Sequence, residues 1–149
     1  MKTPAELTTL FRQRGLKVTP QRQAIFRVLH DADVHPTADA VYDEVSAQMP
    51  TISLRTVYQT LNDLTEMGEI LQLDLGTGSA RFDGNVDPHH HLVCDECGMV
   101  LDVYADADGL RVPPRQRRGF EITATDIVFR GRCPDCRSKS EQHRKEDHG

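Results

Sequence analysis

The chain has 149 residues, of which 38% are hydrophobic and 28% charged, and its formal net charge is −5. That length suggests one domain or two small ones, and the composition is too apolar for an intrinsically disordered chain. No apolar run approaches the 18 residues of a transmembrane helix, and MKTPAELTTLF has no apolar signal region, so we expect no membrane partner and a cytoplasmic location.

The negative charge is distributed unevenly along the chain. Residues 1–30 contain six basic side chains and one acidic one, whereas residues 61–110 contain one basic and eleven acidic ones. The mean charge argues against a nucleic-acid partner. The distribution, in contrast, allows the basic start to face a polyanion and the acidic middle to bind cations.

Two helices are predicted at the start of the chain. Leucine and phenylalanine recur at helical spacing within residues 4–14, and Gly15 ends that helix. Thr19 followed by Pro20 is typical of a helix start, with threonine as the N-cap and proline at the first helical position.

Two further helices and a hairpin follow. Thr37 caps a helix that ends before Pro50, and Ser53 caps a helix that ends at Gly68. An apolar stretch, a Gly-Thr-Gly-Ser turn and a second short strand through Phe82 then predict a β-hairpin.

Three helices followed by a hairpin is the order of a winged helix, here with one extra helix in front. The helix after Ser53 would be the recognition helix, and residues 69–83 would be the wing. Arginine, tyrosine and glutamine on its polar face can contact base edges and phosphates. A helical bundle with a solvated polar face is the alternative. The candidate DNA contacts are Lys17, Arg22, Arg55, Thr56, Tyr58 and Gln59.

The second half of the chain has the pattern of a small α/β domain. Strands are predicted at 91–94 and 99–104, with further strands at Ile122 and 127–129. Pro113 and Pro114 exclude a long helix in the segment 105–119 that separates these strands. From Ser138 onward the chain is polar, and we predict disorder there. The expected division is therefore 1–84 (winged-helix domain), 85–137 (dimerisation and metal-binding domain) and 138–149 (disordered tail), an α+β fold overall.

Four cysteines form two CxxC pairs. A CxxC turn lets two thiolates converge on one ion, and two such turns complete a tetrahedral sulfur shell that suits Zn²⁺. Such a closed site would supply folding energy and no catalysis. Reducible disulfides or a redox pair are the alternatives, but neither pair has a βαβ context. The predicted structural zinc ligands are Cys94, Cys97, Cys133 and Cys136.

Three consecutive histidines lie beside the acidic segment. On a strand His89 and His91 point to one face and His90 to the other, so the first two can chelate one ion. A solvent-exposed histidine run is the alternative. With His35, Asp83 and Asp102 they would supply three nitrogens and two carboxylates, a set that suits Fe²⁺, Mn²⁺ or Zn²⁺. Spacing alone does not establish that the five residues converge.

Five motifs support one resemblance: KVTPQR at 17–22, HPTA at 35–38, RTVYQTL at 55–61, RFD at 81–83 and HHHLVCDECG at 89–98. Together they resemble the ferric uptake regulator family over about residues 5–137. The resemblance implies a homodimeric, metal-dependent repressor that binds operator DNA through a winged-helix domain and dimerises through an α/β domain with a four-cysteine zinc site.

Within that family the chain is most similar to the peroxide-sensing branch. This branch carries aspartate at the positions of Asp83 and Asp102 and histidine at those of His35, His89 and His91. The resemblance implies that Fe²⁺ or Mn²⁺ at these five residues holds the DNA-binding form. Hydrogen peroxide, acting at Fe²⁺, would oxidise His35 or His89, release the metal and end repression.

Two other functions fit the same ligands. An iron-level sensor of the same family would lose its metal only when iron is scarce. A metal-dependent hydrolase would need an open coordination position and a nearby general base, and the residues beside the histidines supply no such base. We therefore expect a transcriptional repressor that is not an enzyme and has no small-molecule substrate.

Overall fold

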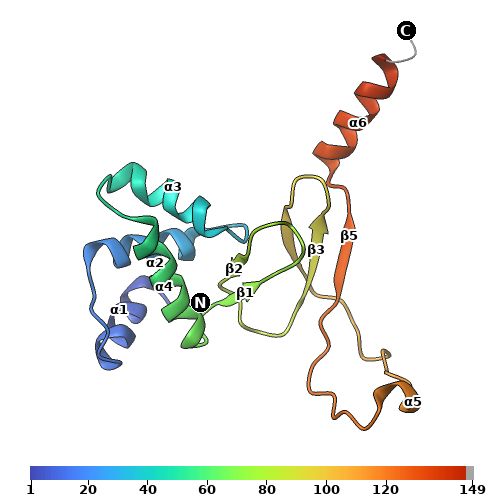
Figure 1. Ribbon diagram of the computed structural model, residues 1–149, viewed down its shortest axis with the longest axis horizontal. Coiled ribbons are helices and arrows are strands. Elements are labelled where there is room, and N and C mark those ends of the chain that lie inside the picture. The colour runs from blue at the N-terminus through green and yellow to red at the C-terminus, as the bar shows by residue number, and fades with distance from the viewer. Residues whose placement is uncertain (147–149) are drawn as a thin grey trace. The chain divides into compact units, whose positions relative to one another are not determined.

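The computed structural model describes residues 1–146, and it divides into two compact units (Figure 1). The first is Met1–Asp87, and the second begins at Pro88. The division lies three residues after the predicted boundary between 84 and 85, because the turn after the wing packs with the first unit. Among the described residues, no helix is both long enough and apolar enough to cross a membrane.

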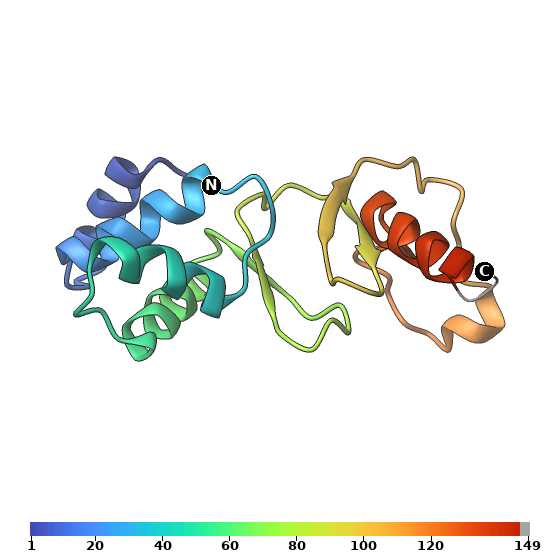
Figure 2. The ribbon, with the colours of Figure 1, turned by 90° about the horizontal axis from the view of Figure 1, so that it is seen from above.

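The first unit is the predicted winged helix with one extra helix in front. The hairpin strands are antiparallel, with Gln72 opposite Phe82. Figure 2 gives a second view of the four helices. The elements are α1 (Pro4–Gln13), α2 (Pro20–Asp31), α3 (Ala38–Gln48), α4 (Leu54–Glu66), β1 (Leu71–Leu73) and β2 (Arg81–Asp83).

The helices begin where their capping residues predict. Thr19, Thr37 and Ser53 each accept a hydrogen bond from the backbone N–H three residues later, at 3.1–3.2 Å. Such caps satisfy backbone donors that have no partner within the helix. The first helix has a cap that the sequence pattern did not predict: Thr3 and Glu6 form a reciprocal capping box. The backbone N–H of Thr3 lowers the pKa of the Glu6 carboxyl.

The apolar faces of the four helices meet in one core. Phe11 of α1 and Phe26 of α2 pack edge to face, with ring centroids 4.9 Å apart. Leu61 and Leu64 of α4 are completely buried in the same cluster, and Phe82 brings β2 into it. The wing is therefore packed against the helices.

A short segment before α3 also pairs with the wing. The backbone N–H of Phe82 donates to the carbonyl of Pro36 at 2.9 Å, and Thr37 and Arg81 form an antiparallel bridge. Residues 36–37 thus pair with β2 along a short stretch at the edge of the hairpin. This pairing places His35 beside β2.

The second unit is built on a three-stranded sheet in the order β4-β3-β5. The central strand is antiparallel to β4 and parallel to β5. The elements are β3 (His90–Cys94), β4 (Val100–Val103), α5 (Pro114–Arg117), β5 (Val128–Gly131) and α6 (Pro134–Glu146). As expected from Pro113 and Pro114, the helix at that point has only four residues.

Two expectations for the second half were wrong. Ile122 lies in no strand and is 48% exposed, and its segment pairs with neither of the edge strands β4 and β5. The tail expected to be disordered is helical as far as Glu146, and residues 147–149 lie outside the described part. Pro134 stands at the first helical position with Asp135 beside it, and the residues that follow have good helix propensity.

Truncating a core leucine should destabilise the first unit. For Leu61→Ala we expect a loss of about 2–5 kcal/mol in the free energy of unfolding, because the side chain is completely buried. Leu71→Ala is the matched control: this leucine is 37% exposed, and we expect a loss below about 1 kcal/mol. Urea unfolding followed by circular dichroism measures both, and equal losses would contradict this account of the core.

Candidate functional site

The four cysteines lie together in the second unit. Cys94 ends β3, Cys97 follows in the turn, Cys133 follows β5 and Cys136 lies in the first turn of α6. One sulfur from each lies within 4.8 Å of all the others, and all four are free thiols. The structure thus brings together the complete predicted sulfur shell.

Strand pairing explains why the two CxxC turns meet. Cys94 lies opposite Gly131 in the parallel β3–β5 pair, and the backbone N–H of Asp95 donates to the carbonyl of Gly131 at 2.8 Å. The first turn closes through Gly98, whose N–H donates to the Cys94 carbonyl and whose φ of 74° suits glycine. The two turns are therefore held at neighbouring strand ends.

The thiols differ in their readiness to ionise. The backbone N–H groups of Cys97 and Cys133 lower the pKa of Cys94 to about 6, and the latter N–H lies 3.3 Å from its sulfur. The thiol of Cys133 and burial together raise the pKa of Cys136 well above its usual value. For Cys97, the backbone N–H of Met99 lowers the pKa, but the Cys94 thiol and burial outweigh it and the pKa is raised. A metal ion must therefore displace protons from some of these thiols.

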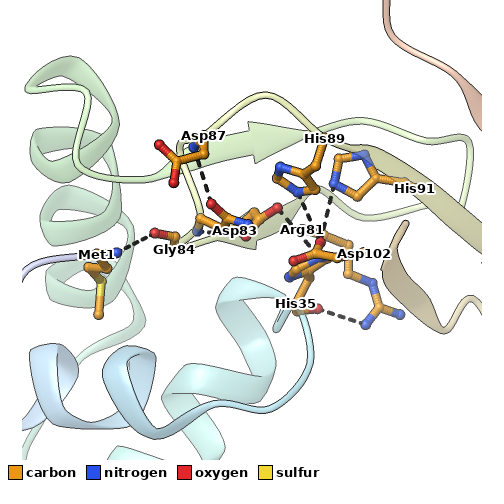
Figure 3. Close-up of polar contacts among 10 residues, drawn as sticks. Met1, His35, Arg81, Asp83, Gly84, Asp87, His89, His91 and Asp102 are labelled. Atoms are coloured by element: carbon orange, nitrogen blue, oxygen red, sulfur yellow. Dashed lines mark hydrogen bonds and ion pairs between the residues drawn. The ribbon is translucent and has the colours of Figure 1, made fainter. Parts of the chain in front are cut away.

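A second group of potential ligands lies in the second unit. Asp102 of β4 lies opposite His91 of β3, and its Oδ1 is 3.0 Å from Nε2 of His89 and 3.7 Å from Nε2 of His91. Figure 3 shows both imidazoles directed toward this carboxylate. The two histidines are buried, with ring centroids 4.6 Å apart. Two nitrogens and one carboxylate thus converge, as alternation along the strand predicts.

His90 is directed elsewhere. Its Nδ1 accepts a hydrogen bond from the backbone N–H of Ile127 at 3.1 Å, on the β5 side of the sheet. The expected opposite facing of His90 is confirmed. Sequence patterns did not predict Tyr104, whose ring stacks on that of His89 at 5.8 Å between centroids. Only the pairing of β3 with β4 reveals this neighbour.

The first unit contributes the remaining two candidate ligands. Nε2 of His35 lies 3.4 Å from Oδ2 of Asp83, which ends β2 and is 1% exposed. The backbone N–H of Asn85 donates to the other carboxylate oxygen at 2.8 Å, and Arg81 donates to the backbone carbonyl of His35 at 3.0 Å. A buried carboxylate beside an imidazole suits a divalent cation, because an isolated buried charge is costly.

The candidate DNA contacts differ in how exposed their side chains are. Lys17 is exposed, and Arg55, Tyr58 and Gln59 lie on the exposed face of α4, with Tyr58 46% exposed. Thr56 is half-buried, and its hydroxyl is 3.0 Å from that of Ser53.

Arg22 has a different environment from the other candidates. Its guanidinium forms an ion pair with Asp63 of α4 at 2.9 Å and lies 5.3 Å from the ring centroid of Phe11. Its side chain is only 12% exposed. This arginine connects three helices within the unit, so its charge is already engaged. Sequence spacing cannot reveal this pairing across 41 residues.

A hollow of about 260 Å³ lies between the wing and α4. Tyr58 of α4, Thr37 at the start of α3 and Ser79 of the wing tip are among its lining residues. Tyr58 of α4 and the tip of the wing therefore line the same hollow.

Comparisons with known proteins agree with this architecture. A sequence model of the ferric uptake regulator family matches residues 13–130. The chain is 36% identical over 129 residues to the peroxide-responsive repressor PerR of Staphylococcus aureus, which covers 86% of this chain and 87% of that protein.

Solved structures share the fold. The ferric uptake regulator from Francisella tularensis with iron has a TM-score of 0.68 at 26% identity, covering 83% of this chain and 96% of that one. PerR from Streptococcus pyogenes, described in terms of peroxide sensing and gene regulation, has a TM-score of 0.53 at 26% identity, covering 91% and 94%. With its winged helix, its α/β unit and its four-cysteine cluster, the chain belongs to the ferric uptake regulator family of metal-responsive transcriptional regulators.

Proposed function

We propose that this protein is a metal-dependent repressor that is released from operator DNA when peroxide oxidises its regulatory site. The observation that carries the proposal is the donor set. Three histidines and two aspartates could hold a metal ion, the set that the resemblance implies for a peroxide sensor, and the chain is 36% identical to a peroxide-responsive repressor.

The two groups of ligands would bind a single ion. Along the chain, Asp83 is the last ligand of the first unit and His89 is the first ligand of the second, and only six positions separate them. That length of chain spans at most about 20 Å when fully extended. A metal ion held by both groups would restrict the relative movement of the two units. Metal binding would thereby favour one DNA-binding arrangement.

The donor set also favours the proposed chemistry. The three histidines and two aspartates would hold Fe²⁺, which would supply reduction of hydrogen peroxide next to its own ligands, whereas Mn²⁺ held there would not. One peroxide oxygen would be inserted into a ring C–H bond of His35 or His89 while the other leaves as water, and the oxidised imidazole would be a poorer ligand with lower metal affinity. The protein would act as a sensor and turn over no substrate.

DNA binding is assigned to α4 and the wing. Arg55, Tyr58 and Gln59 would face the major groove, and Lys17 would contact phosphate. Thr56 would contribute from the same helix. We do not include Arg22 among the contacts, because its guanidinium is bound to Asp63.

The second unit would form the homodimer. Leu92 lies opposite Leu101 on one side and Phe129 on the other, so the three side chains form one apolar stripe across the sheet. Each of them is 40–42% exposed. A second copy covering this stripe would remove it from water, and a two-fold dimer would match a palindromic operator. Zn²⁺ held by the four thiolates would stabilise this unit, and the protein would act in the cytoplasm.

Peroxide should modify the iron-loaded protein and spare the manganese form. After stoichiometric hydrogen peroxide, we expect the peptide containing His35 or His89 to gain the mass of one oxygen atom, because only Fe²⁺ generates the oxidant at the site. Peptide mass spectrometry of both metal forms makes the measurement. If repression yields to chelation but survives peroxide with no such adduct, the protein is an iron-level sensor.

The histidines of β3 should differ sharply in their effect on regulatory metal binding. His91→Ala removes a ligand, and we expect Mn²⁺ affinity to fall by more than the about 10–100-fold that is typical for loss of a residue that only orients a ligand. His90→Ala is the matched control and should leave the affinity nearly unchanged, because its imidazole accepts from the backbone of Ile127. Mn²⁺ titration of the zinc-loaded protein measures both. A large effect of His90→Ala would contradict the assigned facing.

Zinc and the dimer should be lost together. Cys94→Ser removes the thiol with the lowest pKa of the shifted cysteines and one quarter of the sulfur shell, so we expect loss of zinc and dissociation to monomers. Asp95→Asn, at the exposed position beside it, should retain both. Zinc analysis and analytical ultracentrifugation make the comparison, and a stable zinc-free dimer would refute a structural role for the site.

A further inference from the structure

One charged side chain beside the candidate metal ligands has no role in the function proposed above. Arg81 lies at the start of β2, two residues before Asp83, and its side chain extends toward the segment before α3 (Figure 3). Nη1 donates to the backbone carbonyl of His35 at 3.0 Å. This contact joins residues that are 46 positions apart in the chain.

The burial of Nε in this half-buried side chain calls for an explanation. Among the described residues, Nε of Arg81 is a buried side-chain nitrogen without a hydrogen-bond partner. Leaving such a donor without water or a partner opposes folding. A methionine or leucine would fill the position without that cost, but neither would donate to the carbonyl of His35.

Three contacts hold the His35 segment against β2. Besides the arginine contact, the N–H of Phe82 donates to the carbonyl of Pro36 at 2.9 Å, and Thr37 pairs with Arg81. The two backbone contacts begin only after His35. The arginine contact acts on the backbone of His35 itself.

We propose that Arg81 is a positioning residue for the regulatory metal. By holding the His35 carbonyl, its guanidinium fixes the imidazole with Nε2 directed at Asp83, 3.4 Å from Oδ2. Asp83 is already held through Asn85. The first unit therefore presents its two donors in a fixed arrangement before metal binds, which lowers the entropic cost of binding. The inference rests on the proposed regulatory site.

The test is a double-mutant cycle on Mn²⁺ affinity in the full-length, zinc-loaded protein. Unbound Mn²⁺ is measured by electron paramagnetic resonance. We expect Arg81→Met to lower the affinity by about 10–100-fold, as for other residues that orient metal ligands. Arg27→Met, at an exposed position of α2 in the same unit, is the matched control and should have no effect.

The cycle separates positioning from general destabilisation. If Arg81 acts through His35, then Arg81→Met should cause no further loss in a His35→Ala background, because the group it positions is gone. Losses that add would overturn the proposal, as would wild-type affinity in Arg81→Met. Unchanged affinity in His35→Ala would instead overturn the regulatory site itself, and the inference with it.

A metal-free measurement provides a second test. In the zinc-loaded protein without Mn²⁺, amide hydrogen exchange at Phe82 should be faster in Arg81→Met than in wild type and unchanged in Arg27→Met. Unchanged exchange in Arg81→Met would contradict the proposal that Arg81 holds the His35 segment against β2. Arg81→Gln, whose amide is too short to reach the carbonyl, should reproduce both effects and replaces the methionine variant if that variant does not fold.

Discussion

The register of a single strand determines both candidate metal centres. β3 is the central strand of its sheet, so β4 fixes it on one side and β5 on the other. Pairing with β4 sets Asp102 opposite His91, and pairing with β5 sets the end of the strand at Cys94 opposite Gly131. A slip of one residue would turn His91 to the other face and separate the two CxxC turns. The two candidate metal centres therefore depend on the same strand pairing.

The acidic residues in the middle of the chain include two of the candidate metal ligands. The acidic residues of the middle segment include Asp83, which is almost completely buried, and Asp102, which lies between two imidazoles. A buried carboxylate such as that of Asp83 opposes folding unless a cation or protonated group compensates it. Part of the negative net charge thus comes from two candidate metal ligands. In the proposed function it would not conflict with a basic, DNA-facing start.

Local features of the molecule could be predicted from the sequence, and contacts across the chain could not. Thr19, Thr37 and Ser53 mark helix starts because capping depends on residues a few positions apart. The cysteine cluster followed from two short spacings. Arg22, by contrast, pairs with Asp63, which lies 41 positions away, and Arg81 donates to the carbonyl of His35, 46 positions away. No periodicity records such pairings.

The same distinction explains the errors at the C-terminal end. Ile122 has an apolar side chain in a region of strand-forming residues, but a strand also needs a partner strand, and the Ile122 segment joins neither edge of the sheet. The polar sequence after Ser138 lacks an apolar stripe, which removes the usual tertiary signal for a helix. Helix propensity and the proline at the first position of α6 act without such a stripe. Low hydrophobicity alone was therefore a poor guide to disorder here.

In the proposed function, a metal ion held by ligands of both units would be coupled to DNA binding in both directions. If the ion favours the DNA-binding arrangement by a given free energy, then bound DNA raises metal affinity by the same amount. Ligands preorganised within each unit would confine the cost of metal binding mainly to restricting the relative movement of the units. Oxidation of one ligand would then have a large effect, because it would remove the free energy that compensates that restriction. The regulatory response would accordingly depend on the hinge, while the fold of each unit stays intact.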